Sequence, residues 1–143
     1  MLASDTDEEP GQPRFEFPVV ECDIDKAWHG IHFVLTGTDA EQPLPLGFIL
    51  NGGTDIGDDL GYGPARLLTA QQVGEIATAL EPFDAAAFAQ RVDHKALCEH
   101  SIYSMDEDCE EDDREYLCEF FGELRAFMEA AGERGDGVLV TLC

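Results

Sequence analysis

Apolar residues recur with a helical period in two long stretches of the chain. In residues 23–38 they stand three and four positions apart, which places them on one face of an α-helix. Residues 108–131 hold the same spacing. We expect the two amphipathic helices to share one core with a β-sheet. Their apolar positions are Ile24, Ala27, Trp28, Ile31, Val34 and Leu35, and Leu117, Phe120, Phe121, Leu124, Phe127, Met128 and Ala131.

Residues at the ends of both stretches are typical of helix termini. Asp23 is suited to cap the first helix, and Gly37 suits the left-handed residue that ends it. Gly132 and Gly135 are expected to stop the second helix. The single tryptophan, Trp28, can bury roughly 200 Å². Its loss should therefore cost about 3–5 kcal/mol of folding free energy.

Shorter helices are predicted between these two. Thr69 and Gln72 form a capping-box pattern ahead of a helix that Pro82 ends. Asp84 and Asp93 are each positioned to cap a further short helix. Residues 46–50 can form one apolar turn under the core.

Strand patterns occur near both ends of the chain. In residues 15–20 apolar side chains alternate on one face, as in a half-buried strand, and Pro18 would place this strand at a sheet edge. Residues 65–68 suit a short strand, and the β-branched stretch 137–143 suits a buried one. Residues 54–64, rich in Gly and Asp, are expected to form a surface loop.

The pattern predicts one domain. Residues 1–14 are polar, acidic and contain Pro and Gly, so they are expected to form a flexible leader. Residues 15–143 should then form a single domain, because a chain of 143 residues is long enough for one well-buried core.

Charge is the strongest feature of the composition. Thirty-one acidic residues against eight basic ones give a formal net charge of -23. Such a surface disfavours nucleic acid and anionic membranes and leaves basic proteins as partners, although solubility alone would also explain it. The densest acidic region is a candidate interaction face: Asp106, Glu107, Asp108, Glu110, Glu111, Asp112 and Asp113.

The cysteines and the N-terminus indicate a cytoplasmic protein. Five cysteines without a C-x-x-C pair are expected to be reduced thiols. The first residues lack the features of a signal peptide, and no apolar run approaches the ~20 residues of a membrane span. Oligomeric state is not indicated.

Four segments together resemble the YfbM-like family, small bacterial proteins that carry a domain of unknown function. They are DIDKAWHGIHFVLTGT, LGYGPARLLTAQQVGEIATAL, YLCEFFGELRAFM and VLVTL, within residues 23–142. The resemblance implies an α+β fold, with several helices packed on a small, mainly antiparallel sheet, and no assigned activity. It also implies a strand and a helix before the D-K-x-W motif. This chain is expected to lack that segment or to replace it with residues 1–14.

A pocket near the first helix is the main candidate for small-molecule chemistry. Asp25, Trp28 and His32 can share one helix face, where a carboxylate-oriented imidazole would suit a general base, although such a histidine is more often a core residue with one hydrogen bond. The glycine-rich loop brings Tyr62 and Arg66 as possible anion ligands, and Lys26 is one of few cations.

Motifs for catalysis and metals are missing from the sequence. Cys98 next to His100 offers only one ligand pair for zinc, and nearby acids oppose a thiolate. The acidic run has Glu111 and Leu117 where a calcium loop needs Gly and Glu. No serine lies in G-x-S-x-G. We therefore expect no catalytic residue, metal or cofactor.

Two functions remain open. The first is a non-enzymatic interaction domain that binds a basic protein, for example as an immunity-type inhibitor of a basic toxin. The second is a small-ligand-binding protein or enzyme with a pocket near His32, Tyr62 and Arg66.

Overall fold

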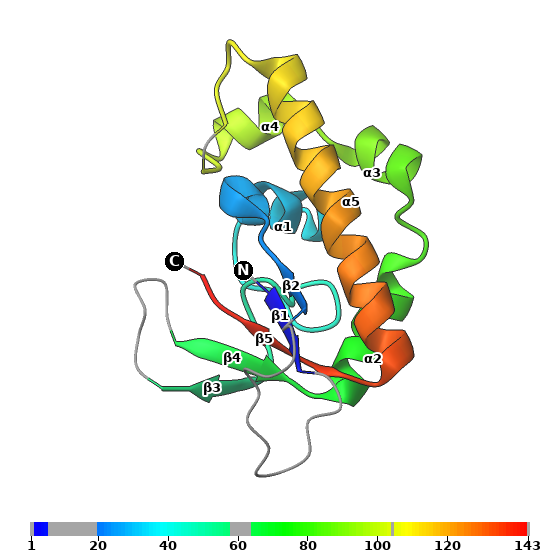
Figure 1. Ribbon diagram of the computed structural model, residues 1–143. Helices are drawn as coiled ribbons and strands as arrows, with labels where there is room; N and C mark the ends of the chain where they lie inside the picture. Colours follow the sequence, from blue (N-terminus) through cyan, green and yellow to red (C-terminus); the bar gives the residue numbers. More distant parts are fainter. Residues whose placement is uncertain (1, 6–19, 58–63, 104, 143) are drawn as a thin grey trace.

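The computed structural model describes residues 2–5, 20–57, 64–103 and 105–142. In these residues five helices pack with a five-stranded sheet, so the fold is α+β, as the resemblance implies (Figure 1). Both long amphipathic helices are present.

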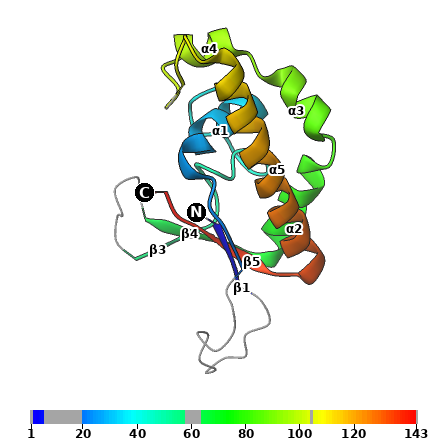
Figure 2. The ribbon, with the colours of Figure 1, turned by 45° about the horizontal axis from the view of Figure 1, so that its top comes forward.

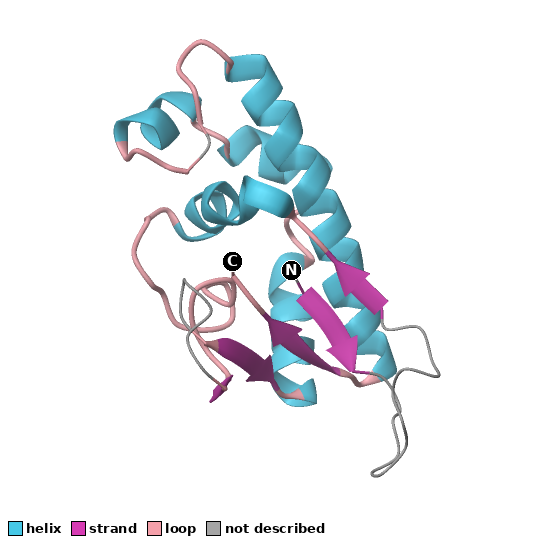
Figure 3. Cartoon of the chain, turned by 60° about the vertical axis from the view of Figure 1, so that its left-hand side comes forward, coloured by secondary structure: helices cyan, strands magenta, loops and turns pink. Residues whose placement is uncertain are grey.

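All strand pairs of the sheet are antiparallel, in the order β2-β1-β5-β4-β3. Figure 3 shows these short strands side by side under the helices. The central strand is β5, which lies between β1 and β4: Val140 of β5 is opposite Leu2 of β1 on one side and Arg66 of β4 on the other. The C-terminal strand therefore pairs with the N-terminal strand in the middle of the sheet. The strands are β1 (Leu2–Asp5), β2 (Val20–Cys22), β3 (Thr54–Ile56), β4 (Ala65–Leu68) and β5 (Gly137–Val140).

The helices lie on the core face of the sheet. A 3-10 turn, Asp25–Ala27, leads into α1. Helices α2 and α5 lie side by side in both Figure 1 and Figure 2, and they contact β5 and β2 respectively. The helices are α1 (Trp28–Thr36), α2 (Ala70–Leu80), α3 (Ala85–Arg91), α4 (His94–Glu99) and α5 (Glu110–Arg134).

The predicted caps are present except at Asp23, because α1 has Ala27 as its N-cap and no side-chain cap bond. The Thr69 hydroxyl accepts from the Gln72 amide, and the Gln72 side chain accepts from the Thr69 amide. Asp84 and Asp93 accept from backbone amides at the starts of α3 and α4. Gly37 ends α1 in the left-handed region with φ 80°. Apart from Asp23, these local signals in the sequence therefore placed the helix starts and ends correctly.

The core is centred on aromatic rings contributed by different helices. Phe88 of α3 and Phe121 of α5 are buried and stack with ring centroids 4.1 Å apart. Phe48 is buried in the turn that precedes β3. Trp28 is only partly buried and packs against the edge of the core. Its indole therefore contributes less to the core than the sequence suggests.

Two strands form where the sequence analysis predicts irregular chain. Leu2–Asp5, part of the predicted flexible leader, pair with both β2 and β5, and the rest of that segment lies outside the described residues. Thr54–Ile56, part of the predicted surface loop, pair with β4 as an exposed edge strand. Both assignments were wrong because pairing with another strand determines these short strands, and three or four residues show no periodicity of their own.

A strand before the D-K-x-W motif is therefore present as β1, which lies within residues 1–14, so of the two alternatives the chain does not simply lack a strand there. The predicted strand over residues 15–20 lies outside the described residues except at Val20, which begins β2. Gly132 does not stop α5: the helix continues to Arg134, and Gly135 ends it with φ 73°. A Cβ atom at Gly132 would lie 3.2 Å from Cβ of Ala77, so this glycine allows α5 to approach α2 closely.

Candidate functional site

The segment between β2 and α1 is held in one conformation by hydrogen bonds to its carboxylates. The Asp25 amide donates to Oδ1 of Asp23 at 2.8 Å. Asp25 itself has φ 50°, a left-handed conformation that aspartate tolerates better than most residues. The Tyr116 hydroxyl of α5 donates to Oδ2 of Asp25 at 2.7 Å and accepts from the Lys26 amide at 3.0 Å.

Tyr116 is protonated when it makes these contacts. Partial burial, and to a smaller extent the hydrogen bond to Asp25, raises the pKa of Tyr116 to about 12. At neutral pH the hydroxyl is therefore a fixed donor to the Asp25 carboxylate. This fixes the position of Asp25 relative to α5.

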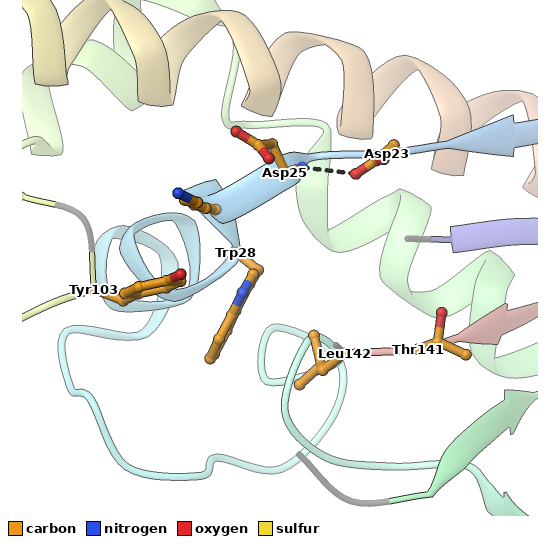
Figure 4. Close-up of a pocket in the computed structure, with 7 residues that line it drawn as sticks. Asp23, Asp25, Trp28, Tyr103, Thr141 and Leu142 are labelled. Carbon is orange, nitrogen blue, oxygen red and sulfur yellow. Dashed lines mark hydrogen bonds between the residues drawn. The ribbon is translucent and has the colours of Figure 1, made fainter. Parts of the chain in front are cut away.

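A cavity of about 290 Å³ opens beside this segment. We call it the indole cavity. Its aromatic side consists of Trp28 and Tyr103, whose ring centroids lie 6.1 Å apart. Figure 4 shows Tyr103 on one side of the Trp28 ring and Leu142 on the other, with Asp23 and Asp25 on the chain that enters α1. The lining residues are Asp23, Asp25, Lys26, Trp28, Tyr103, Thr141 and Leu142.

His29 links the aromatic side of the cavity to the loop after α4. Its ring stacks on Trp28 with centroids 5.3 Å apart, and its Nδ1 accepts from the Tyr103 amide at 3.1 Å. Burial lowers the pKa of His29, which is consistent with an unprotonated Nδ1. The imidazole therefore holds Tyr103 next to Trp28.

A second cavity, of about 250 Å³, lies next to Arg66. The guanidinium donates to the carbonyl oxygens of Phe48, Ile49 and Gly52. Burial lowers the pKa of Arg66, while Asp55 and Glu41 oppose this shift. Because the donated hydrogen bonds are directed at the turn before β3, Arg66 holds that turn and is poorly placed to bind an anion.

The predicted pocket is divided between separate places. Asp25, Lys26 and Trp28 line the indole cavity, and Arg66 lines the second cavity. His32 is fully buried, and its Nε2 lies 2.8 Å from the Ala40 carbonyl oxygen. Tyr62 lies outside the described residues. His32 and Arg66 therefore do not converge, because the helix turns the imidazole into the core.

Six of the seven carboxylates of the predicted acidic face are exposed. Asp113 is the exception: it is 8% exposed and accepts from Nε2 of His94 and from the Asp106 amide, both at 2.8 Å. Asp113 therefore connects α5 both to α4 and to the loop between α4 and α5. The exposed carboxylates, which we call the acidic segment, are Asp106, Glu107, Asp108, Glu110, Glu111 and Asp112.

The cysteine candidate has a different neighbour from the one predicted. Sγ of Cys98 lies 3.7 Å from Nε2 of His94, the nitrogen that Asp113 already holds. His100 instead packs on Phe33 and faces Asp39. Burial and then Glu107 raise the pKa of the Cys98 thiol, which opposes a thiolate.

The ligand-type side chains and the helices of the described part of the chain bear on metal binding and membrane insertion. No group of three or more His, Cys, Asp or Glu side chains there is arranged to hold a metal ion. No helix among the same residues is long and apolar enough to cross a membrane.

The indole cavity contains residues that sequence reasoning missed. Tyr103, Thr141 and Leu142 come from segments far from α1 in the chain. Tyr116 does not line the cavity but holds Asp25, and it gave a usable signal: it precedes Leu117 on the apolar stripe of α5, which places it near the core boundary.

The fold and the site define a single-domain α+β protein with a carboxylate-bearing aromatic cavity. Residues 2–141 match the family model described as "Domain of unknown function (DUF1877)", and the chain belongs to that family. It is similar to the crystal structure of YfbM from Escherichia coli, a protein of unknown function, with a TM-score of 0.69 and 24% identity over 96% of this chain and 95% of that one. The YfbM-like resemblance is thereby confirmed. No curated protein matches the chain.

Proposed function

We propose that this protein binds a basic protein partner through the acidic segment and catalyses no reaction itself. The observation that carries the proposal is the exposure of six carboxylates between residues 106 and 112. They occupy the loop and first turn of α5, at the end of the molecule away from the sheet (Figure 1). A partner could approach this end without contacting the sheet.

The charges of the acidic segment are not neutralised within the described part of the chain. The ion pairs found there are His94–Asp113, Lys95–Glu99, His100–Asp39 and Arg134–Asp136, and none uses a carboxylate of the segment. The N-terminal dipole of α5 offsets only part of this charge. The full-length net charge of -23 adds to the same field.

This arrangement suits a partner whose own surface binds phosphate. Carboxylates at a protein interface steer association with a basic surface and suppress wrong partners. The partner class is therefore a basic toxin or nuclease, and the protein would act as its inhibitor by placing carboxylates where phosphates bind. The affinity should fall steeply with ionic strength, because exposed charges are screened.

The test compares two variants of equal charge. One neutralises the acidic segment with D106N, E107Q, D108N, E110Q, E111Q and D112N. The control neutralises six exposed glutamates elsewhere, with E75Q, E81Q, E119Q, E123Q, E129Q and E133Q. Each is used as bait in extracts of the cells that make the protein, and retained proteins are identified by mass spectrometry.

We expect the wild type and the control variant to retain the same basic proteins, and the acidic-segment variant to lose them. Raising NaCl from about 50 to about 500 mM should release them from the wild type. Equal retention by both variants would show that net charge, not this surface, attracts basic proteins, and would contradict the proposal.

A further inference from the structure

The indole cavity combines an aromatic surface with two carboxylates that are already positioned. Trp28 and Tyr103 supply ring surface, and Leu142 supplies aliphatic surface. Asp23 and Asp25 add negative charge at the entrance to α1. At about 290 Å³ the cavity lies near the lower end of the range for small-ligand sites, roughly 300–1,000 Å³.

Both carboxylates are held by the protein through one oxygen each. Oδ1 of Asp23 accepts from the Asp25 amide, and Oδ2 of Asp25 accepts from Tyr116. Among the described residues, no partner hydrogen-bonds to the second oxygen of either group. Asp25 also has a left-handed φ of 50°, a conformation that these contacts help to hold. A preset acceptor binds a donor at lower entropic cost than a mobile one.

We propose that the indole cavity is a binding site for an organic cation, an ammonium or guanidinium group on a short apolar stem. The stem packs on Trp28 and Leu142, and the charged end is attracted by the ring faces and by Asp23 and Asp25. The cation is either a free amine or an Arg or Lys side chain of another protein. An anion is disfavoured by the carboxylates and by the charge of the whole chain.

Lys26 is the one cationic side chain among the described lining residues, and it distinguishes a cationic ligand from a zwitterion or an anion. Two carboxylates against one ammonium leave the lining negative. For a cationic ligand Lys26 can only repel, so its removal should strengthen binding. For a zwitterion or an anion, Lys26 would instead be the main attractive group, and its removal should weaken binding.

The single tryptophan makes binding directly observable. Trp28 is the only tryptophan of the chain, so its fluorescence reports on this cavity alone. The free-amine probe is agmatine, and the side-chain probes are blocked tripeptides Gly-Arg-Gly and Gly-Lys-Gly. Blocked Gly-Gln-Gly is the neutral control, and NaCl is kept at matched ionic strength.

We expect agmatine or the cationic tripeptides to change Trp28 fluorescence saturably, with Kd at or below about 1 mM, and Gly-Gln-Gly to have no effect. Agmatine alone would identify a free amine as the ligand, and the tripeptides alone a protein side chain. No saturable change with any cation, or an equal change with Gly-Gln-Gly, would overturn the proposal.

Two substitutions, followed by calorimetry, test the residues. Asp25→Asn keeps an acceptor for Tyr116 and tolerates the left-handed backbone, so the fold should survive, and cation affinity should fall about tenfold. Lys26→Gln should raise the affinity several-fold. Glu119→Gln removes one exposed charge from α5 outside the cavity and should change nothing. Unchanged affinity in Asp25→Asn, or weaker binding in Lys26→Gln, would contradict a cation site.

This site goes beyond the proposed function and is tested separately from it. The variant with a neutralised acidic segment should bind agmatine as the wild type does, because none of its six residues lines the indole cavity. Loss of cation binding with retained partner capture would reject the cavity proposal alone. The reverse result would reject the proposed function alone.

Discussion

The imidazole of His32 holds two segments together at a single buried point. It is fully buried in α1, and its Nε2 lies 2.8 Å from the Ala40 carbonyl oxygen, an atom that can only accept. Nε2 therefore carries the proton, and Nδ1 has no hydrogen-bond partner among the described residues. Burial lowers the pKa of His32, so the ring is neutral in the folded state. Its contacts pin the chain after α1 to the helix.

The His32 interaction should make stability depend on pH. A folded-state pKa below the unfolded value, about 6.5, contributes stability that is present above about pH 6.5 and lost as pH falls toward the folded-state value. His32→Gln keeps an amide donor near the place of Nε2 but does not titrate. Urea unfolding should show the wild type to be more stable than His32→Gln at about pH 7.5. The difference in unfolding free energy between the two proteins should be smaller at about pH 5. Parallel pH profiles would contradict this assignment.

Aromatic residues should differ sharply in their contribution to stability. Phe121 is 1% exposed and lies almost parallel to Phe88, whereas Trp28 is only partly buried. Phe121→Ala should cost about 3–5 kcal/mol of unfolding free energy because it leaves a closed void. Trp28→Ala should cost clearly less, since part of the indole already faces the indole cavity. Equal losses in urea titrations would show that the indole supports the core after all.

At the scale of elements, helix ends were predictable and strands were less so. The capping box at Thr69 and the caps at Asp84 and Asp93 depend on residues within one turn, so the sequence shows them directly. The strand β1 pairs with β5 near the other end of the chain, and β3 pairs only with β4, the next strand along. Their three or four residues carry no alternation that a local reading can detect.

The same distinction explains how much of the candidate site could be predicted. Asp25 and Trp28 stand three positions apart at the start of one helix, and the sequence analysis placed them together. Tyr103 and Leu142 join them only because α4, α5 and β5 pack around α1, which no spacing within the chain reveals. His32 is a buried core histidine with one hydrogen bond, the alternative that the sequence analysis gave beside a pocket, because its helix face meets the core.

Glycines in α5 offer a matched pair of substitutions. Gly122 lies within the helix, is exposed, and a Cβ there would meet nothing within 4 Å, so Gly122→Ala should stabilise the protein by about 0.5–1 kcal/mol. Gly135, at the end of α5, has φ 73°, so Gly135→Ala should destabilise it by about 1 kcal/mol. Thermal unfolding of the two variants should shift in opposite directions. A loss of stability in Gly122→Ala would mean that its surroundings are more crowded than described.

At the scale of the whole molecule, charge opposes folding. A net charge of -23 on 143 residues repels itself in the compact state, and added salt screens that repulsion. The acidic segment concentrates this effect, because its six carboxylates lie within seven consecutive positions, whereas the six control glutamates are spread along α2 and α5 and just beyond α2. Coulomb repulsion falls with distance, so equal numbers of charges should not cost equal free energy.

The two charge-neutralised variants should therefore differ in stability as well as in partner binding. The carboxylates of the segment share one loop and one helix turn, so their mutual repulsion should exceed the i,i+4 repulsion of the control pairs Glu119/Glu123 and Glu129/Glu133 and the favourable dipole of α5. Removing the segment should therefore raise the unfolding free energy more than removing the control glutamates does. The difference should be largest at about 20 mM NaCl and nearly vanish at about 500 mM, where close charges are screened. Denaturant titrations at both salt concentrations measure it. A larger gain for the acidic-segment variant would mean that this surface costs folding stability, which supports a role in binding. An equal or smaller gain would leave solubility as the simpler reason for its composition.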